Sequence, residues 1–511
     1  MESPRYYDRR DMAPCSTLHF RPEGALVGDA SFFRNGDECH IFYLSKRSDD
    51  PPRLPTCQLD HAVSNDLLHW ERLPTALFPG KAGEPDDDGI GGCTIVYRDG
   101  RYHMFYAGTN PQVTYHAESS DLIEWRKDSP LKPVIVPDPR WYMAHDAAVE
   151  DPYNERGWRD PFLFHDDKRG RYVMTVTARR NQGPWRERGC VAWVVSRDLV
   201  DWEVQPPLYA PSLGMNLEVT ELFAMDGRYF LIFCHGETNT TRYRVADRPE
   251  GPYRCPVDDV LLPNYMYAPR TIERQGKRYL IPWVADRLNG SDDNRSEFGA
   301  EGVTWGGALG TPQEMRCLPD GRLALFFPEI VAGLSGAQTL GAGSLDHLQT
   351  ERGEWQRQGE TVLASSDQGM ARGLVAVRGQ DFLLSCGIRI RRGAAGGLIL
   401  RAGEGGEAGY YLRLEPALKS VSLWRYPRPW FFSRPLAVRV IPDLDYGQTI
   451  AVKVILHRHV LDVYLDGRHV LSRAVYDYRD GQFGLFVEDA EAEFGPLAAN
   501  TLEEGNRNGK C

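Results

Sequence analysis

The stretch that decides the fold is Gly157-Trp158-Arg159-Asp160-Pro161-Phe162-Leu163-Phe164. It places a polar Arg-Asp-Pro tip directly before an apolar run, which is typical of a loop that enters a buried strand. Four further stretches follow the same plan, with a polar, acidic or small residue, an apolar strand, a turn and a second apolar, aromatic strand. They begin at Asp29, Cys93, Glu218 and Ala268. The sequence therefore contains an internal repeat of five hairpins.

The turns of these hairpins support the repeat. Asn35-Gly36, Asp99-Gly100 and Asp226-Gly227 separate apolar runs, and such pairs are the strongest short-range hairpin signal. Arg169-Gly170 and Gln275-Gly276 stand at the equivalent places of the other two copies. The copies start 50 to 67 residues apart, a spacing that fits propeller blades of about four strands each.

A second motif, Ser-x-Asp-Leu-x-x-Trp, follows three of the hairpins. It occurs at 64–70, 119–125 and 196–202. It predicts a tight turn in which the Asp side chain bonds local backbone N–H groups and the Trp packs onto the blade. We interpret these motifs as structural.

The pattern changes near residue 360, where period-two alternation between Gly-rich turns begins. Phe382–Ile390 and Ile450–Leu456 are examples, and such alternation favours an antiparallel β-sandwich. The expected fold is all-β, a five-bladed β-propeller followed by a C-terminal β-sandwich. We assign 1–335 to the propeller, 336–358 to a linker, 359–500 to the sandwich and 501–511 to a disordered tail.

Composition narrows the function classes. The 511 residues carry a net charge of -11, which argues against nucleic acid and anionic membranes as partners. The N-terminus has no apolar signal region and no apolar stretch is long enough to span a bilayer. The 10 Cys show neither C-x-x-C pairs nor zinc spacing, so we expect reduced thiols and a cytoplasmic protein. No Gly-rich phosphate loop or metal-ligand cluster appears, so we expect no cofactor and no metal.

Three acids stand where the repeats predict convergence. A propeller gathers one end of each innermost strand around its axis, and those positions carry Asp29, Asp160 and Glu218 in register in three copies. Clustered carboxylates repel one another and spread their pKa values, which a fold tolerates where they perform chemistry. We interpret them as a pair for glycosidic cleavage plus a third acid. Three independent turn-capping acids are the alternative.

The chain resembles glycoside hydrolase family 32, the β-fructofuranosidases, invertases, inulinases and levanases. The resemblance rests on short motifs in the correct order: Leu18-His19-Phe20-Arg21-Pro22 before Asp29, Arg159-Asp160-Pro161, Glu218-Val219-Thr220-Glu221-Leu222-Phe223, Tyr267-Ala268-Pro269-Arg270-Thr271 and Trp305-Gly306-Gly307-Ala308-Leu309. It covers about residues 18–335 well and the remainder in outline. It implies a five-bladed propeller followed by a sandwich, and a retaining mechanism.

The resemblance also implies roles for individual residues. Asp29 corresponds to the nucleophile and Glu218 to the acid/base. Asp160 corresponds to the acid that binds sugar hydroxyls and stabilises the transition state, with Arg159 orienting the carboxylates. Glu221 is the rival acid, and its match is to the family's second acidic position.

The sequence departs from the family beside the nucleophile. Val27-Gly28-Asp29-Ala30-Ser31 lacks the flanking Asn and Pro, and Gly91-Gly92-Cys93 replaces a Ser-Gly-Ser loop. These positions shape the terminal-sugar pocket, so the sugar itself is open.

We expect further residues at or near the sugar. Arg159, Glu221, Asp88, Trp141, Tyr267 and Trp305 are the candidate substrate-binding residues. His145 and His235 are expected to be structural, and the run Asp86-Asp87-Asp88 is expected to be a solvated loop rather than a cation site.

Several functions remain compatible with these residues. The first is a retaining glycosidase on β-fructofuranosides or a related furanoside, and transfer to another acceptor would make it a fructosyltransferase. An arabinofuranosidase-like propeller enzyme, often inverting, is the second. A non-catalytic carbohydrate-binding protein is the third. The expected partner is an oligosaccharide or glycoside, and the sequence leaves the oligomeric state open.

Overall fold

The computed structural model describes residues 18–47, 57–146, 157–263, 266–287, 292, 303–428 and 434–502. The chain is built mainly of antiparallel β-strands, as the expected all-β class requires. Contacts divide it into two units, each described here by itself. The N-terminal unit contains Asp8–Asp286 and Val303–Ala324, and the C-terminal unit contains Arg287–Gly302 and Leu325–Asn506. The polar lead-in 1–17 and the tail beyond Leu502 lie outside the described residues.

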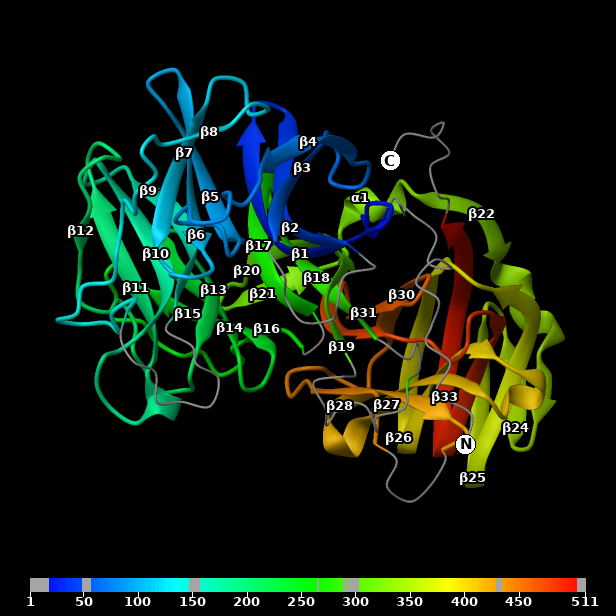
Figure 1. Ribbon diagram of the computed structural model, residues 1–511. Helices are drawn as coiled ribbons and strands as arrows, with labels where there is room; N and C mark the ends of the chain where they lie inside the picture. The colour runs from blue at the N-terminus through cyan, green and yellow to red at the C-terminus, as the bar shows by residue number, and fades with distance from the viewer. Residues whose placement is uncertain are drawn as a thin grey trace, which may run out of the picture. The chain divides into compact units, whose positions relative to one another are not determined.

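Five groups of antiparallel strands form the N-terminal unit (Figure 1). The first group is β1 (Ala25–Asn35), β2 (Glu38–Arg47), β3 (Gln58–Ser64) and β4 (Glu71–Leu77). The second is β5 (Ile90–Arg98), β6 (Arg101–Gly108), β7 (Thr114–Ser119) and β8 (Arg126–Lys127). The third is β9 (Trp158–Asp166), β10 (Arg171–Arg179), β11 (Gly189–Ser196) and β12 (Glu203–Val204), with the short helix η2 (Trp185–Glu187). The fourth is β13 (Leu217–Met225), β14 (Arg228–His235), β15 (Thr240–Ala246) and β16 (Val260–Leu262). The fifth is β17 (Met266–Arg274), β18 (Lys277–Arg287) and β20 (Gln313–Cys317), while β19 (Val303–Leu309) pairs with β1.

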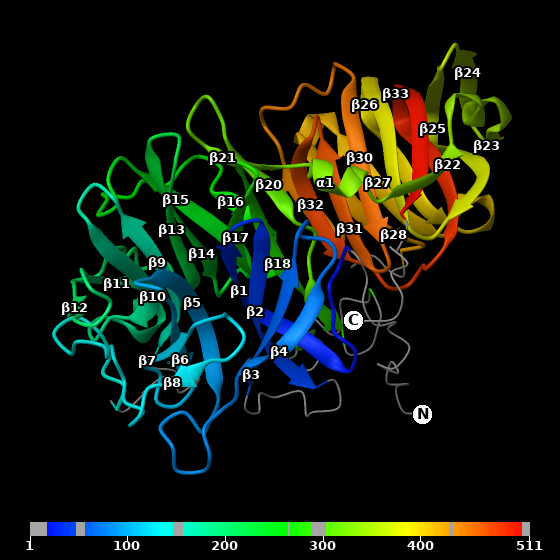
Figure 2. The ribbon, with the colours of Figure 1, turned by 90° about the horizontal axis from the view of Figure 1, so that it is seen from above.

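The first strands of the five groups lie next to one another. Strand β1 contacts β5, β5 contacts β9, β9 contacts β13, β13 contacts β17, and β17 contacts β1 again. The view from above shows these strands gathered at the centre of the unit (Figure 2). Residues at the start of each first strand are therefore brought together from stretches far apart in sequence.

Each first strand carries a β-bulge at the same point of its pairing with the second strand. Two residues of the first strand oppose one residue of its neighbour, and the five pairs are Gly28-Asp29, Gly91-Gly92, Asp160-Pro161, Val219-Thr220 and Ala268-Pro269. A bulge bends its strand and re-aims the side chains beside it. The repeat therefore extends to a distortion of the backbone that the sequence does not reveal.

The predicted turns are confirmed. In Asp99-Gly100, Asp226-Gly227 and Gln275-Gly276 both residues have positive φ, which is the type I′ geometry of tight hairpins. The Ser-x-Asp-Leu-x-x-Trp turns also form as expected. Asp121 accepts bonds from the N–H groups of residues 123 and 124, and the Trp125 indole N–H donates to the Leu122 carbonyl.

The C-terminal unit consists of long antiparallel strands with a few short helices. After β21 (Leu323–Phe326), which crosses the boundary, it contains α1 (Glu329–Ala332), β22 (Ser335–Leu340), η4 (Ala342–His347), β23 (Gln349–Glu351), β24 (Glu354–Gln358), β25 (Thr361–Gly379), β26 (Phe382–Ala402), η5 (Glu404–Gly406), β27 (Gly409–Glu415), η6 (Pro416–Leu418), β28 (Ser420–Tyr426), β29 (Ala437–Val440), β30 (Ile450–His457), β31 (Val460–Leu465), β32 (Arg468–Ala474) and β33 (Gly481–Leu502). Strand β33 pairs with both β25 and β26. Alternate residues of the strands of this unit, among them Leu384, Leu412 and Val454, form a large buried core.

The stretch 336–358, which the sequence suggested to be a linker, instead carries secondary structure. Strand β22 pairs with β33, and β23 and β24 pair with β25. The stretch is therefore part of the C-terminal unit. Among the described helices, none combines the length and the apolar character needed to cross a membrane.

A buried histidine pair between β2 and β3 predicts acid sensitivity. His40 Nδ1 lies 2.9 Å from His61 Nε2, and the His61 ring stacks on Phe42. Burial, and then the neighbouring His40, lower the pKa of His61 to about 3. Because this pKa lies below the ordinary value of about 6.5, stability is present above pH 6.5 and falls as the unfolded chain takes up a proton below it.

We expect the wild type to lose about 2 kcal/mol of unfolding free energy through His61 between pH 6.5 and pH 5. His61→Gln keeps a hydrogen-bonding partner for His40 but cannot titrate, so it should show a shallower decline. Urea unfolding at the two pH values measures this. Equal pH slopes in the wild type and the variant would contradict the prediction.

Candidate active site

Three carboxylates meet at the bulges of the N-terminal unit. Asp29, Asp160 and Glu218 come from β1, β9 and β13, as the sequence predicted. They are not in register, however. Glu218 is the last paired residue before its bulge, Asp160 is the first bulge residue, and Asp29 is the second. The expectation of equivalent positions was wrong in this detail, because the three acids occupy three successive positions relative to equivalent bulges.

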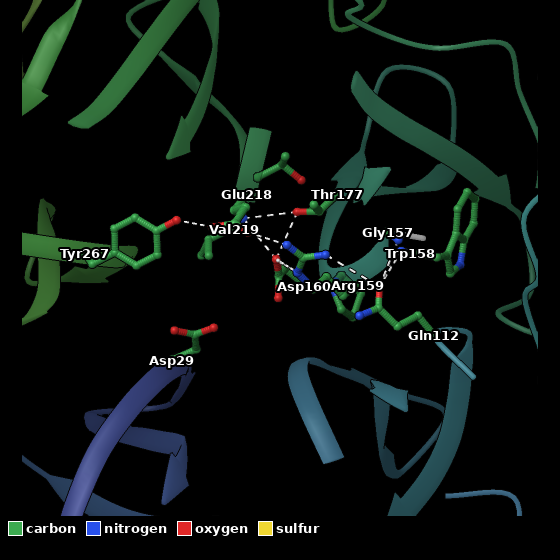
Figure 3. A network of polar contacts seen from close by, with 12 residues as sticks. Asp29, Gln112, Gly157, Trp158, Arg159, Asp160, Thr177, Glu218, Val219 and Tyr267 are labelled. Atoms are coloured by element: carbon green, nitrogen blue, oxygen red, sulfur yellow. Dashed lines mark hydrogen bonds and ion pairs between the residues drawn. The ribbon is translucent and has the colours of Figure 1, made fainter. Parts of the chain in front are cut away.

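Glu218 is held by two residues that stand at the equivalent position in the neighbouring repeats. Arg159 and Tyr267 are the last paired residues before the bulges of β9 and β17. The Arg159 guanidinium pairs with Glu218 Oε1, and the Tyr267 hydroxyl donates to Oε2 (Figure 3). Both oxygens of Glu218 are thus oriented by side chains from the two adjacent sheets.

Asp160 is a buried acceptor for a strained neighbour. Its Oδ2 accepts bonds from Thr177 Oγ1 at 2.9 Å and from the Val219 backbone N–H at 3.2 Å. Asp160 and Val219 both have positive φ, at 56° and 52°, a region that is costly for a β-branched residue such as valine. The bulge in β13 therefore turns the Val219 N–H toward the Asp160 carboxylate.

Asp29 faces the other two acids from the first sheet. Figure 3 shows its carboxylate across the site from Asp160 and Glu218, with no hydrogen bond drawn to either. Burial is the largest cause that raises the pKa of Asp29 to about 7, and the charges of Asp160 and Glu218 add to it. The Trp283 indole N–H, 2.9 Å from Asp29 Oδ1, and Arg159 act in the opposite direction. Near neutral pH this group of acids therefore holds a proton.

Trp283→Phe tests this electrostatic description. The substitution removes the N–H that stabilises the charged form of Asp29, so the pKa of Asp29 should rise. The acid limb of the kcat/KM profile should then move to higher pH. Trp125→Phe is the matched control, since the Trp125 N–H donates to a backbone carbonyl in a turn. An unchanged acid limb in Trp283→Phe would count against Asp29 as the group that must be ionised.

Gln112 is a residue of the site that sequence reasoning missed. Its Oε1 accepts bonds from the backbone N–H groups of Gly157 and Trp158, at 3.0 and 3.2 Å, and lies 3.5 Å from Arg159 Nη1 (Figure 3). It fixes the Arg-Asp-Pro tip and the guanidinium that reaches Glu218. No local sequence signal marks it, because its partners are more than 40 residues away.

Glu221, the rival acid, has a different environment. Its side chain is fully buried, and both carboxylate oxygens accept bonds from Thr271, from its hydroxyl and its backbone N–H. Arg278 lies 3.7 Å from the same carboxylate. Glu221 thereby ties β13 to β17.

The remaining candidates lie in varied surroundings. Tyr267 and Trp305 are half-buried and both pack against the cluster that contains Val219 and Trp283. Trp141 is 37% exposed beside Arg140. Asp88 is exposed and accepts a bond from the Asn110 amide at 2.8 Å.

The histidines and the acidic run have structural contacts. His235 Nδ1 lies 2.7 Å from Thr238 Oγ1, and its Nε2 lies 2.7 Å from the Leu213 carbonyl oxygen, as expected for a structural histidine. His145 is half-buried. Asp86 is buried and pairs with Lys127 at 2.5 Å. The expectation that the run Asp86-Asp87-Asp88 is a solvated loop was therefore wrong for Asp86. Among the described side chains, no group of three His, Cys, Asp or Glu could hold a metal ion.

Comparison with known proteins places this chain in a family. The model of the N-terminal domain of glycosyl hydrolases family 32 matches residues 19–324. A sucrose-6-phosphate hydrolase of Zymomonas mobilis is 24% identical over 344 residues, 61% of this chain and 60% of that protein. The insoluble β-fructofuranosidase isoenzyme CWINV1 of Arabidopsis thaliana is 31% identical over 160 residues, 29% of this chain and 24% of that protein. The matches thus span about 60% or less of the length of these relatives.

Solved structures share the fold over nearly the whole chain. The sucrose-6-phosphate hydrolase of Lactobacillus gasseri aligns with a TM-score of 0.70 at 18% identity, covering 98% of both chains. The GH32 β-fructofuranosidase BmSUC1 of Bombyx mori aligns with a TM-score of 0.65 at 19% identity, covering 98% of this chain and 95% of that one. At such identities the likeness concerns the fold.

Proposed function

Because the chain belongs to glycoside hydrolase family 32, we propose that it is a retaining glycosidase that acts on β-fructofuranosides. The single observation that supports this most is the convergence of Asp29, Asp160 and Glu218 from three strands, with both oxygens of Glu218 held by Arg159 and Tyr267. Neighbouring carboxylates, one protonated and one ionised, supply the general acid and the nucleophile for cleavage at one sugar carbon.

In the first step the Asp29 carboxylate attacks the anomeric carbon while Glu218 donates its proton to the glycosidic oxygen. The bond between that carbon and oxygen breaks, the leaving group departs as an alcohol, and an ester joins the sugar to Asp29. Tyr267 and Arg159 hold the two Glu218 oxygens during this transfer. Asp160 stabilises the positive charge that develops on the sugar ring.

In the second step water attacks the same carbon and Glu218 takes its proton. The ester bond breaks, Asp29 is released as a carboxylate, and two inversions give net retention. A sugar hydroxyl in place of water would give a transfer product. Trp305, Tyr267, Trp141, Asp88, Arg159 and Glu221 remain our proposed set of substrate contacts, of which Glu221 is the weakest, since Thr271 occupies its oxygens.

We further propose that the five strand groups are the blades of a five-bladed propeller and that the C-terminal unit is a β-sandwich. The cyclic contacts of the first strands support the propeller, and the large buried core between long antiparallel strands supports the sandwich. A cytoplasmic location also remains a proposal, and the described cysteines, all free thiols, are compatible with it.

Product analysis tests the function. Purified protein is incubated with sucrose, short inulin- and levan-type oligosaccharides, and an aryl arabinofuranoside. We expect release of free fructose, with the β-anomer formed first, as seen by NMR within the first turnovers. Transfer products would assign a fructosyltransferase, and turnover of the arabinofuranoside alone would change the sugar. Inactivity on every compound would overturn the proposal.

A further inference from the structure

Gly28, the residue before the proposed nucleophile, packs directly against an aromatic ring. A Cβ atom at residue 28 would lie 2.3 Å from both Cη2 and Cζ2 of Trp305. Real carbon atoms do not approach so closely, so any side chain at 28 requires the indole to move. Glycine at this position and tryptophan at 305 therefore depend on each other.

The repeat shows what this position does elsewhere. Gly28 is the first bulge residue of β1, and Asp160 is the first bulge residue of β9. In the third sheet this position supplies a carboxylate to the site. In the first sheet it supplies no side chain, and the Trp305 ring occupies the adjoining space.

Trp305 is also close to the reacting side chains. Its ring centroid is 6.3 Å from that of Trp283, whose N–H donates to Asp29, and Trp283 lies 5.8 Å from Tyr267, whose hydroxyl donates to Glu218. Tyr267, Trp283 and Trp305 thus form a row of aromatic rings, here called the aromatic wall, beside Asp29 and Glu218.

We propose that the Gly28–Trp305 pair determines which sugar the site accepts. The inference rests on the proposed function. At this point the sugar meets an indole face rather than a hydrogen-bonding side chain. The site therefore favours a fructofuranoside that presents C–H groups to Trp305, because its hydroxyl at that contact is missing or substituted. Sugars stack their C–H faces on aromatic rings, and an apolar contact neither requires a hydroxyl nor penalises its loss strongly.

A double-mutant cycle tests the contact itself. We expect Gly28→Asn to lower kcat/KM for sucrose by about 100-fold or more, because the new side chain collides with the indole. Trp305→Ala in the same chain should recover at least about 10-fold of that loss by making room. Additive effects of the two substitutions would show that the pair is not coupled and would overturn the inference. Thermal unfolding of all four proteins separates misfolding from lost activity.

A substrate series tests the selectivity. The probes are sucrose and sucrose analogues in which one fructosyl hydroxyl is removed or O-methylated, one position at a time. For at least one analogue, we expect the wild type to keep kcat/KM within about 10-fold of sucrose or to exceed it. Trp305→Ala should lower that ratio by about 10-fold or more, and Trp305→Phe, which retains an aromatic face, should lower it less.

Trp202→Ala is the matched control. This half-buried tryptophan belongs to a turn of the third sheet, so its loss should affect stability and leave the analogue ratios unchanged. Sucrose turnover with analogue ratios that Trp305→Ala does not change would overturn the inference and keep the proposed function. Absence of turnover for sucrose and every analogue would instead overturn the proposed function, and the inference with it.

Discussion

Replacing Asp29 by Asn should abolish turnover and at the same time stabilise the fold above pH 7. Loss of the nucleophile removes the covalent step, and deletions of this kind cost about 10⁴-fold or more in kcat. The amide can still accept the Trp283 N–H bond that the carboxylate accepts. Steady-state kinetics with the best fructoside of the product analysis measure the first effect.

The stability effect follows from the raised pKa of Asp29. The folded pKa of about 7 exceeds the ordinary value of 3.8, so the stabilising contribution is present below pH 3.8 and is lost as the pH rises toward 7. An uncharged Asn avoids that loss. Because Asp29 is only half-buried, we expect a gain of about 1–2 kcal/mol at pH 8.

Asp99→Asn serves as the control for both effects. Asp99 lies in an exposed hairpin turn, so its substitution should change neither activity nor the pH dependence of unfolding. An Asp29→Asn variant that turns over substrate at a wild-type rate would refute the assignment of the nucleophile. A variant that is inactive and less stable at pH 8 would refute the electrostatic account.

Replacing Glu218 by Gln should produce a loss that depends on the leaving group. Without a proton donor, sucrose should react about 10²–10⁴-fold more slowly, because its leaving alkoxide needs protonation. An aryl fructofuranoside with an acidic phenol needs little help to leave. Its first turnover should therefore stay near the wild-type rate and appear as a burst of phenol in rapid-mixing kinetics.

Glu221→Gln distinguishes the two candidate acids. Glu221 is bonded to Thr271 by both oxygens, so its substitution should lower stability without any dependence on the leaving group. If Glu221→Gln rather than Glu218→Gln slowed sucrose selectively, the acid/base would be Glu221. Equal slowing of sucrose and the aryl fructoside by Glu218→Gln would mean that Glu218 is not the proton donor.

The sequence predicted the strands and the turns well, because these depend on neighbouring residues. Alternating apolar runs and pairs such as Asp99-Gly100 specify hairpins locally. The convergence of Asp29, Asp160 and Glu218 was also predictable, since strands that repeat in sequence repeat in space. The comparison of repeats thus gave the three acids together with the family resemblance.

The stagger of the acids and their supporting residues could not be predicted in the same way. A bulge changes which residues oppose each other without leaving a mark in the composition of the strand, so the sequence predicts equivalent positions for Asp160 and Glu218. Gln112 acts on Arg159 from another sheet, and Glu221 is distinguished from Glu218 by Thr271 and Arg278, which lie on other strands. Such roles depend on tertiary contacts between distant segments.

The five equivalent bulges suggest how such a site can arise and be redesigned. If one hairpin was duplicated, each copy inherited the same bulge. Five bulges then faced a common centre before any of the strands carried an acid there. Point substitutions then sufficed to place a nucleophile in one bulge and a proton donor directly before another. The bulge Gly91-Gly92 has no side chains. It is therefore the natural place to introduce a new functional group by design.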